Sequence, residues 1–248
     1  MQTLAGKVAV VTGGAGGLGS AICRRLAETG ATVVVGFGRS STVAEQLAAT
    51  LPGDGHCALP APVTNGAAMK SLADEVLRRF GRADILVNCA GITRFVAHAD
   101  LDALDDALID DIFSVNVRGV LASIRAFKNL LAANGDGLIV NISSIAAATA
   151  MGSNVAYCAS KAAVNNLTLS LARALAPAIR VVAVSPGLSD TEFVKSLDQA
   201  WRDEQANRTP LKRLASPDEV ADAVLAVATH LRFTTGAIIP VDGGRPLA

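Results

Sequence analysis

The sequence has no excess of charge of either sign and few aromatic residues. Its 248 residues contain 22 lysines and arginines against 22 aspartates and glutamates, and 4% are aromatic, among them a single tyrosine. A chain without net charge lacks the electrostatic field that draws nucleic acid or an anionic membrane to a protein. We therefore expect neither nucleic acid nor a membrane among its partners.

Cysteine is also scarce and unpatterned. The four cysteines, at Cys23, Cys57, Cys89 and Cys158, lie inside apolar runs and form no CxxC pair. Such cysteines behave as small buried hydrophobic residues, which predicts a reducing compartment. No cluster of His, Cys and Asp has the spacing of metal ligands, so we expect no metal site.

Long apolar runs are missing as well. No uninterrupted apolar stretch reaches the ~18 to 20 residues that a membrane span needs. The N-terminus, Met1-Gln2-Thr3-Leu4, does not lead into the basic segment, apolar stretch and small-residue cleavage site of an export signal. Together these absences predict a cytoplasmic protein.

What the sequence does contain is a regular alternation of short β-branched runs and longer helical patterns. The runs predict buried parallel strands at 8–11, 32–35, 84–87, 138–142 and 180–184, with helices at 18–29, 67–80, 102–133 and 157–176. Continuous apolar strands need cover on both faces. The pattern predicts an α/β fold, a single-domain Rossmann-type doubly wound parallel sheet with helices on both faces.

Nothing in the sequence divides the chain into parts. Without a repeat or a Pro/Ser-rich linker, one domain is expected over residues 1–248, with the polar segment 188–210 as a lid over it. Hydrophobic residues make up 51% of the chain and charged residues only 18%. This exceeds what one monomer core needs and predicts a homo-oligomer, with the helices at 102–133 and 157–176 available for its interfaces.

A glycine-rich turn follows the first strand and opens the first helix. Glycines allow positive φ and a close approach to a pyrophosphate, whose charge then meets the free N–H groups of a helix N-terminus. Two registers of a dinucleotide-binding motif fit, and the sequence does not choose between them. One uses Thr12, Gly13, Gly17 and Gly19, and the other uses Gly14, Gly16 and Gly19.

Four polar residues further along suit proton transfer to a bound substrate. Tyr157 and Lys161 stand four apart at the start of a helix, so they share one face, and a neighbouring ammonium favours the phenolate form of a tyrosine. Ser144 follows a strand at the sheet edge where ligands bind, and it either holds a substrate oxygen or caps a turn, as Ser143 also could. Asn116 is a mediocre helix former at a buried position, where it could hold a water or the lysine.

These residues together resemble the short-chain dehydrogenase/reductase family, from about Lys7 to Gly244. The resemblance implies an NAD(P)-dependent enzyme that interconverts a ketone or aldehyde and an alcohol by hydride transfer, as a carbonyl reductase or alcohol dehydrogenase. It implies that Tyr157 donates or accepts the proton, that Lys161 lowers the pKa of Tyr157 and holds the cofactor ribose, that Ser144 positions the carbonyl, and that Asn116 anchors a proton-relay water. It also implies a tetramer.

The residues expected to bind the cofactor come from the glycine turn and from the ends of the strands. They are Gly13, Ala15, Gly16, Gly17, Leu18, Gly19, Arg39, Ser40, Val63, Asn88, Ala90, Gly91, Tyr157, Lys161, Pro186, Gly187, Ser189 and Thr191. Pro62 stands where many family members have an adenine-binding aspartate, which leaves the base to Val63 and its backbone. Gly135 and Ala178 stand where ketoacyl-carrier-protein reductases often have arginines, so an acyl-carrier-protein partner is less supported.

The end of the second strand favours NADP(H) over NAD(H). Phe37 occupies the position where an NAD site usually offers a carboxylate to the ribose 2′-hydroxyl. Arg39, Ser40 and Ser41 follow it and suit phosphate oxygens. NAD(H) and a solvated Arg39 stay open, because Gly16 supplies no second cation.

Two other function classes also stay open. A catalytically idle nucleotide-binding regulator could share this fold, although the complete set of Ser144, Tyr157, Lys161 and Asn116 argues against it. A methyltransferase with a similar sheet and glycine turn would have no need for the Tyr-x-x-x-Lys pair. The substrate is expected to be a small carbonyl or alcohol compound, in a pocket shaped by 188–210 and by Arg94, Phe95 and His98.

Overall fold

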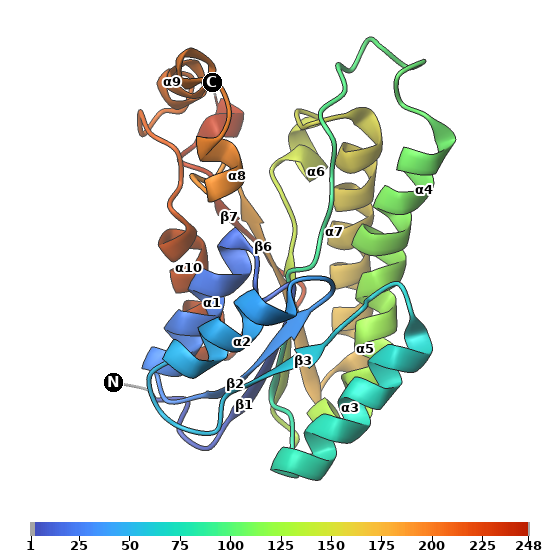
Figure 1. The fold of residues 1–248 in the computed structure, drawn as a ribbon, viewed down its shortest axis with the longest axis vertical. Helices are drawn as coiled ribbons and strands as arrows, with labels where there is room; N and C mark the ends of the chain where they lie inside the picture. Colours follow the sequence, from blue (N-terminus) through green and yellow to red (C-terminus); the bar gives the residue numbers. More distant parts are fainter. Residues whose placement is uncertain (1–2, 248) are drawn as a thin grey trace.

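A computed structural model describes residues 3–247 and folds them around one seven-stranded parallel sheet (Figure 1). Met1, Gln2 and Ala248, which the expected domain over 1–248 includes, lie outside the described residues. The strand order is β3-β2-β1-β4-β5-β6-β7. The strands are β1 (Val8–Thr12), β2 (Thr32–Phe37), β3 (Cys57–Pro60), β4 (Ile85–Asn88), β5 (Gly137–Ile142), β6 (Ile179–Pro186) and β7 (Ile238–Val241).

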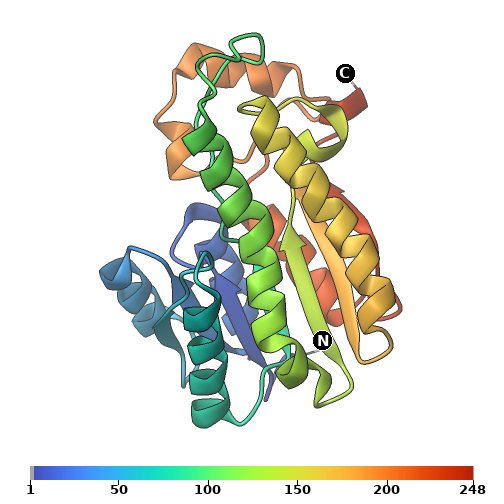
Figure 2. The ribbon, with the colours of Figure 1, turned by 90° about the vertical axis from the view of Figure 1, so that its right-hand side faces the viewer.

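Helices cover both faces of this sheet. One layer holds α1 (Gly17–Glu28), α2 (Ser41–Thr50) and α10 (Pro217–Thr229). The other holds α3 (Gly66–Phe80), α5 (Gly119–Ala132) and α7 (Val155–Leu175), with α4 (Asp106–Phe113) packed beside α7. Figure 2 shows α4, α5 and α7 running along this second face.

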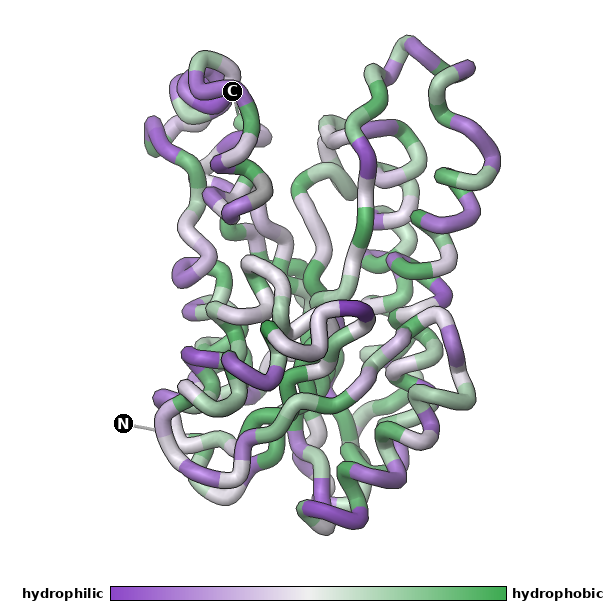
Figure 3. The backbone as a smooth tube through the Cα atoms, viewed as in Figure 1, coloured by the Kyte–Doolittle hydropathy of each residue, from purple (hydrophilic) through white to green (hydrophobic). Residues whose placement is uncertain are grey.

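Strand β1 shows how one short segment serves both layers. Ala9 and Val11 belong to the core beneath α1, α2 and α10, whereas Val8 and Val10 belong to the core beneath α3, α5 and α7. Successive side chains of a strand point to opposite faces, so a strand that is covered on both sides must be apolar throughout. The tube in Figure 3 accordingly shows hydrophobic residues along the central strands and hydrophilic residues along the outer helices. The doubly wound α/β fold is confirmed.

The strand order reverses between β1 and β4, which lie side by side although β2 and β3 separate them in sequence. In open α/β sheets, ligands bind in the crevice outside the carboxyl ends of the strands at such a switch point. The turns after β1 and β4 therefore frame the first place to look for a site.

Two edge strands were not singled out by the sequence pattern. β3 and β7 are each four residues long and lie at the two ends of the sheet. Each contains a proline, Pro60 and Pro240, which cannot donate to a strand ladder and is tolerated at a sheet edge. Short strands with proline give too weak an apolar run to be recognised from sequence.

The single helix expected over 102–133 is wrong in its start and in its continuity. Asp105 accepts a hydrogen bond from the N–H of Leu108 (2.7 Å) and so caps α4, which begins at Asp106. A π-helical turn, η1 (Ser114–Arg118), then separates α4 from α5. Such a turn shifts the apolar pattern only slightly, so the pattern reads as one helix.

Short elements stand above the carboxyl edge of the sheet. They are α6 (Ala146–Thr149), α8 (Glu192–Lys195), α9 (Gln199–Asn207) and η2 (Arg245–Leu247) (Figure 1). Over residues 3–247, no helix is both long and apolar enough to cross a membrane, and no group of three His, Cys, Asp or Glu side chains could hold a metal ion.

Candidate active site

The glycine turn after β1 depends on backbone geometry that a side chain would disturb. Gly13 has φ +66°, and a Cβ placed there would lie 2.8 Å from the Cα of Ala90. A Cβ on Gly19 would overlap the carbonyl oxygen of Gly13, whereas a Cβ on Gly16 would meet no atom closer than 3.3 Å. Because Gly13 and Gly19 are the strict requirements, the structure favours the register that combines them with Gly17.

The start of α1 is open to an anion. Its N-cap, Gly16, has no side chain to satisfy the first backbone N–H groups, and its first turn contains no acidic residue. Ala15 and Leu18 flank this turn and pack partly buried against the core. Free N–H groups and the positive end of the helix dipole suit a phosphate group.

The end of β4 lies directly beside this turn. The N–H of Ala90 donates to Oγ1 of Thr12 (3.3 Å), which ties the two strand ends together. Asn88 is buried, and its Nδ2 donates to Oδ1 of Asn141 (2.9 Å), whose Nδ2 in turn donates to Oγ1 of Thr168 (2.9 Å). Oδ1 of Asn88 has no partner among the described residues. This buried network joins β4, β5 and α7 beneath the site.

Tyr157 is held by the cap of α7. Oδ1 of Asn154 accepts a hydrogen bond from the N–H of Tyr157 (2.7 Å), and Nδ2 of Asn154 donates to the carbonyl of Arg94 (2.7 Å). Burial raises the pKa of Tyr157, and a hydrogen bond with Ser144 opposes part of this rise. The phenol is therefore protonated at neutral pH and can donate a proton.

Lys161 lies one turn further along α7 and is buried. Its Nζ donates to the carbonyl of Ile142 at the end of β5 (2.9 Å) and lies 5.7 Å from the centre of the Tyr157 ring. Burial lowers the pKa of Lys161 to about 8. The expected lowering of the pKa of Tyr157 by Lys161 is not found in this structure: burial raises this pKa, and the group that opposes the rise is Ser144.

The structure distinguishes the two serines after β5. Oγ of Ser143 donates to Oδ1 of Asn165 (2.6 Å), so this buried hydroxyl is committed to α7. Oγ of Ser144 accepts from the N–H of Ala146 (3.2 Å) and interacts with Tyr157. Ser144 thus caps a turn and also faces the tyrosine, so the two roles considered for it are compatible.

Asn116 lies in the π-helical turn η1 and is buried. Its amide forms two hydrogen bonds with the backbone of Ile92, accepting from the N–H (2.9 Å) and donating to the carbonyl (3.0 Å), and it also donates to Oγ of Ser160 (3.1 Å). A Cβ on Gly91 would lie 3.4 Å from Oδ1 of Asn116 and 3.6 Å from Nζ of Lys161. Asn116 therefore fixes the loop after β4, next to the ammonium group.

The segment after β6 packs on the glycine turn. Pro186 ends the strand, the N–H of Gly187 donates to the backbone of β7 (2.9 Å), and Oγ of Ser189 donates to the carbonyl of Gly187 (3.3 Å). Thr191 caps α8, and a Cβ on Gly17 would lie 3.0 Å from the Cβ of Thr191. The segment after β6 and the glycine turn after β1, which are far apart in the sequence, thus lie in contact.

The end of β2 lies beside the same turn, because the carbonyl of Gly36 accepts from the N–H of Gly14 (2.9 Å). Arg39 is exposed and, over residues 3–247, has neither a hydrogen bond nor an ion pair. Ser40 precedes α2, but its side chain makes no capping hydrogen bond. Both side chains are free to meet a ligand.

Val63 has a different environment. Its side chain is buried in the core, where a Cβ on Gly119 would lie 2.8 Å from its Cγ2. Only the backbone of Val63 is available to a base.

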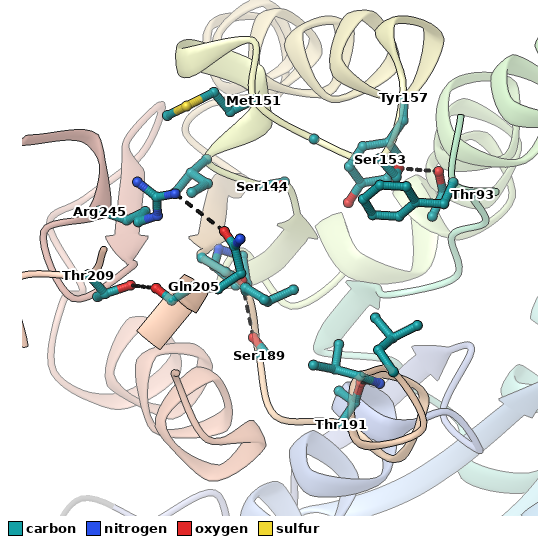
Figure 4. Close-up of a pocket in the computed structure, with 18 of the residues that line it drawn as sticks. Thr93, Ser144, Met151, Ser153, Tyr157, Ser189, Thr191, Gln205, Thr209 and Arg245 are labelled. Carbon is teal, nitrogen blue, oxygen red and sulfur yellow. Dashed lines mark hydrogen bonds between the residues drawn. The ribbon is translucent and has the colours of Figure 1, made fainter. Parts of the chain in front are cut away.

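Tyr157, Ser144 and the segment after β6 line a pocket of about 580 Å³ above the carboxyl edge of the sheet (Figure 4). Phe95 and His98 also line it, whereas Arg94 forms an ion pair with Asp105 (3.0 Å) and does not. Apolar side chains make up much of the wall, namely Phe95, Met151, Leu188, Val194, Leu197 and Trp201. The pocket combines a proton donor with room for a small apolar molecule.

Sequence reasoning missed several residues of this site. Asn154 had a recognisable signal, an asparagine three residues before Tyr157 at a helix start. Gln205 and Arg208 line the pocket and belong to the segment 188–210 that the sequence indicated, whereas Arg245 comes from the end of the described chain. No local pattern places Arg245 near Tyr157.

Comparisons with known proteins agree with this geometry. A family model described as enoyl-(acyl carrier protein) reductase matches residues 13–245. The cis-4-hydroxycyclohexanecarboxylate dehydrogenase of Sinomonas cyclohexanicum is 41% identical over 98% of this chain and 98% of its own. A solved short-chain dehydrogenase/reductase from Brucella melitensis is 30% identical, with a TM-score of 0.90 over 99% of both chains. A 3-ketoacyl-(acyl-carrier-protein) reductase from the same organism, solved in complex with NADH, is 34% identical, with a TM-score of 0.90 over 98% of this chain and all of its own (100%).

Proposed function

Because this chain belongs to the short-chain dehydrogenase/reductase family and is an NAD(P)-dependent oxidoreductase of carbonyl and alcohol groups, we propose that Tyr157 exchanges the proton while Ser144 holds the substrate oxygen. The observation that carries this proposal is that both hydroxyls face one pocket, with the Lys161 ammonium buried a turn away. The relatives are named dehydrogenases and reductases, and the idle-regulator alternative finds no support among them.

The residues present fit a nicotinamide cofactor. The close approach at Gly13 and Gly19 leaves backbone N–H groups at the open start of α1, where a pyrophosphate can bind. Pro186, Gly187 and Ser189 line the pocket together with Tyr157. The loop at Ala90 and Gly91 connects the glycine turn, through Thr12, with Lys161. When bound, the nicotinamide supplies or accepts the hydride that no side chain can provide.

The side chains then have separate tasks. Ser144 donates a hydrogen bond to the carbonyl oxygen of the substrate, and Tyr157 gives that oxygen its proton when the alcohol forms. Lys161 keeps two N–H groups beyond its bond to Ile142 for the ribose and for the phenolate that Tyr157 becomes. Asn116 holds the loop after β4 and, next to Lys161, a water that returns the proton.

The segment 188–210 is the lid in this proposal. Its first residues pack on the glycine turn through Thr191. Val194 of α8, Trp201 of α9 and Leu197 between these helices contribute to the pocket wall. Closing it would exclude water from the reacting carbon.

The direct test is a panel of ketones, aldehydes and alcohols, including a ketoacyl thioester, assayed by the absorbance of the reduced cofactor. Reduction of simple ketones with little activity on the thioester is the expected result. The ketoacyl candidate is retained in the panel because a similar solved protein is a 3-ketoacyl-(acyl-carrier-protein) reductase. Absence of turnover on every compound would contradict the proposed function.

NADPH is expected to be the better cofactor. Arg39 and Ser40 are free of partners beside the glycine turn, and no carboxylate follows β2 to repel a 2′-phosphate. In Arg39→Ala, we expect the preference for NADPH over NADH in kcat/KM to fall about tenfold, which corresponds to one lost charge-assisted contact. Better activity with NADH in the parent, or an unchanged ratio in the variant, would count against this prediction.

A homo-oligomer, by family resemblance a tetramer, is also expected in solution. α4 and α7 expose the large apolar side chains of Phe113, Val155 and Leu169, and Phe233 lies fully exposed nearer the C-terminus. Surfaces of this kind favour association between copies. Light scattering at micromolar concentration should give about four times the chain mass, and a stable 25.3 kDa species would contradict it.

A further inference from the structure

The described part of the pocket wall carries positive but no negative side chains. The described residues that line the pocket include two arginines, Arg208 and Arg245, and no aspartate or glutamate. Arg208 forms only a long ion pair with Glu204 (3.5 Å), and both side chains are more than half exposed. Exposed pairs of this kind contribute little and are easily exchanged for another anion.

Arg245 is partly buried and has no acidic partner within residues 3–247. Its Nη2 donates to Oε1 of Gln205 (3.3 Å), which orients the guanidinium but does not neutralise it. Arg202 on α9, which does not line the pocket, is instead paired with Asp190 (2.8 Å). A partly buried guanidinium without a counter-ion is costly unless a ligand completes it.

The chain is shaped to aim Arg245 at the pocket. Gly243 and Gly244, with φ of +62° and +79°, turn the backbone after β7. A Cβ on Gly243 would lie 2.7 Å from Cγ2 of Thr209, and one on Gly244 would lie 3.1 Å from Cγ of Pro210. This turn therefore packs tightly under the end of the 188–210 segment and fixes where Arg245 begins.

Arg245 and Tyr157 lie at different sides of the pocket, as Figure 4 shows, with Gln205 beside the arginine. The remaining wall is largely apolar, from Met151, Leu188 and Val194 to the edge-to-face pair of Phe95 and Trp201, with ring centroids 6.0 Å apart. A molecule that satisfies both sides has a hydrocarbon body, an alcohol or ketone at one end and an anionic group at the other.

We propose that the substrate is an oxo or hydroxy carboxylic acid whose carboxylate binds Arg245, with Gln205 and Arg208 as further hydrogen-bond donors. The fork of a guanidinium matches a carboxylate in two parallel hydrogen bonds, and such bonds are strengthened in an apolar pocket. This inference rests on the proposed function, since it assumes that the other end of the molecule meets Tyr157.

Binding can be measured without turnover. Calorimetry with the cofactor-loaded protein would compare cyclohexanecarboxylate with the neutral cyclohexanecarboxamide, in the parent, in Arg245→Gln and in Arg245→Lys. We expect the parent to bind the carboxylate at least tenfold more tightly, Arg245→Gln to lose this preference, and Arg245→Lys to retain part of it. Arg24→Gln, an exposed arginine on α1 outside the pocket, is the matched control and should change nothing.

Kinetics separate this inference from the proposed function. The parent should reduce 4-oxocyclohexanecarboxylate with a higher kcat/KM than its methyl ester, and Arg245→Gln should remove the difference by lowering activity on the acid alone. Equal use of acid and ester, or a ratio unchanged in Arg245→Gln, would overturn the carboxylate site while the carbonyl reductase stands. An effect of Arg245→Gln confined to acetoacetyl-coenzyme A would also overturn it, because the arginine would then bind a phosphate group of coenzyme A. Arginine-dependent carboxylate binding without turnover of any ketone would support the site and contradict the proposed function.

Discussion

Replacing Tyr157 by phenylalanine should lower kcat by about 10²- to 10⁴-fold, because the variant loses the only proton that this side chain can transfer. Cofactor affinity should change little, since the ring stays where Asn154 and α7 place it. Steady-state kinetics and a cofactor titration would measure the two effects separately. Turnover within about tenfold of the parent, a barrier change of only ~1.4 kcal/mol, would remove Tyr157 from the mechanism.

The same residue predicts a pH dependence. Burial raises the pKa of Tyr157, so the phenol is the proton donor at neutral pH. Ketone reduction should therefore be constant around neutral pH and decline only as the phenol ionises, while alcohol oxidation should increase with pH. Tyr157→Phe should lose this profile together with its activity.

Lys161→Met should produce an enzyme that is nearly inactive and yet more stable at neutral pH. The variant lacks the ammonium that would hold the ribose and the phenolate. It also lacks a buried charge, whose pKa of about 8 in the fold against 10.5 ordinarily corresponds to about 3 kcal/mol of destabilisation. The carbonyl of Ile142 loses its hydrogen bond in the variant, which destabilises the variant by about 1 kcal/mol. A net gain of about 2 kcal/mol in the free energy of unfolding is expected.

The difference in stability between the parent and Lys161→Met should depend on pH. Below pH 8 both the folded and the unfolded chain carry the proton on Lys161, and the whole cost of burial is present. Between pH 8 and 10.5 the unfolded chain binds more protons, so the stability of the parent rises with pH relative to the variant. Above that range the charge no longer matters, and the lost hydrogen bond to Ile142 leaves the variant about 1 kcal/mol less stable than the parent. Urea unfolding at pH 7 and 10 would measure it, with Lys70→Met, an exposed lysine on α3, as the control. A variant less stable than the parent at pH 7 would contradict this account.

Much of the fold was predictable because the signals are local. Val8 to Val11 and the other central strands are apolar on both faces, and the helices at 17–28, 66–80 and 155–175 end within two residues of expectation. The edge strands β3 and β7 and the π turn at Ser114–Arg118 were missed. Proline and a small shift of register leave little trace in an apolar pattern.

The candidate site also contains residues that the sequence could indicate and features that depend on the folded structure. Gly13, Ser144, Tyr157 and Lys161 follow strands or begin helices in recognisable patterns, so the sequence could indicate them. The position of Arg245 near the pocket depends instead on the turn at Gly243 and on its packing against the lid. The pKa of Tyr157 depends on burial, which no spacing in the sequence reports.

The central claim, hydride transfer to a carbonyl with Tyr157 as proton donor, is tested most directly by isotope transfer. The protein would be incubated with a ketone that it turns over and with reduced cofactor deuterated at the reactive carbon of the nicotinamide, and the product alcohol examined by mass spectrometry and NMR. The account predicts one deuterium on the carbinol carbon of the product from the parent, and no labelled product from Tyr157→Phe beyond its small residual turnover. Product that carries no deuterium at that carbon, or equal labelling rates in parent and variant, would contradict it.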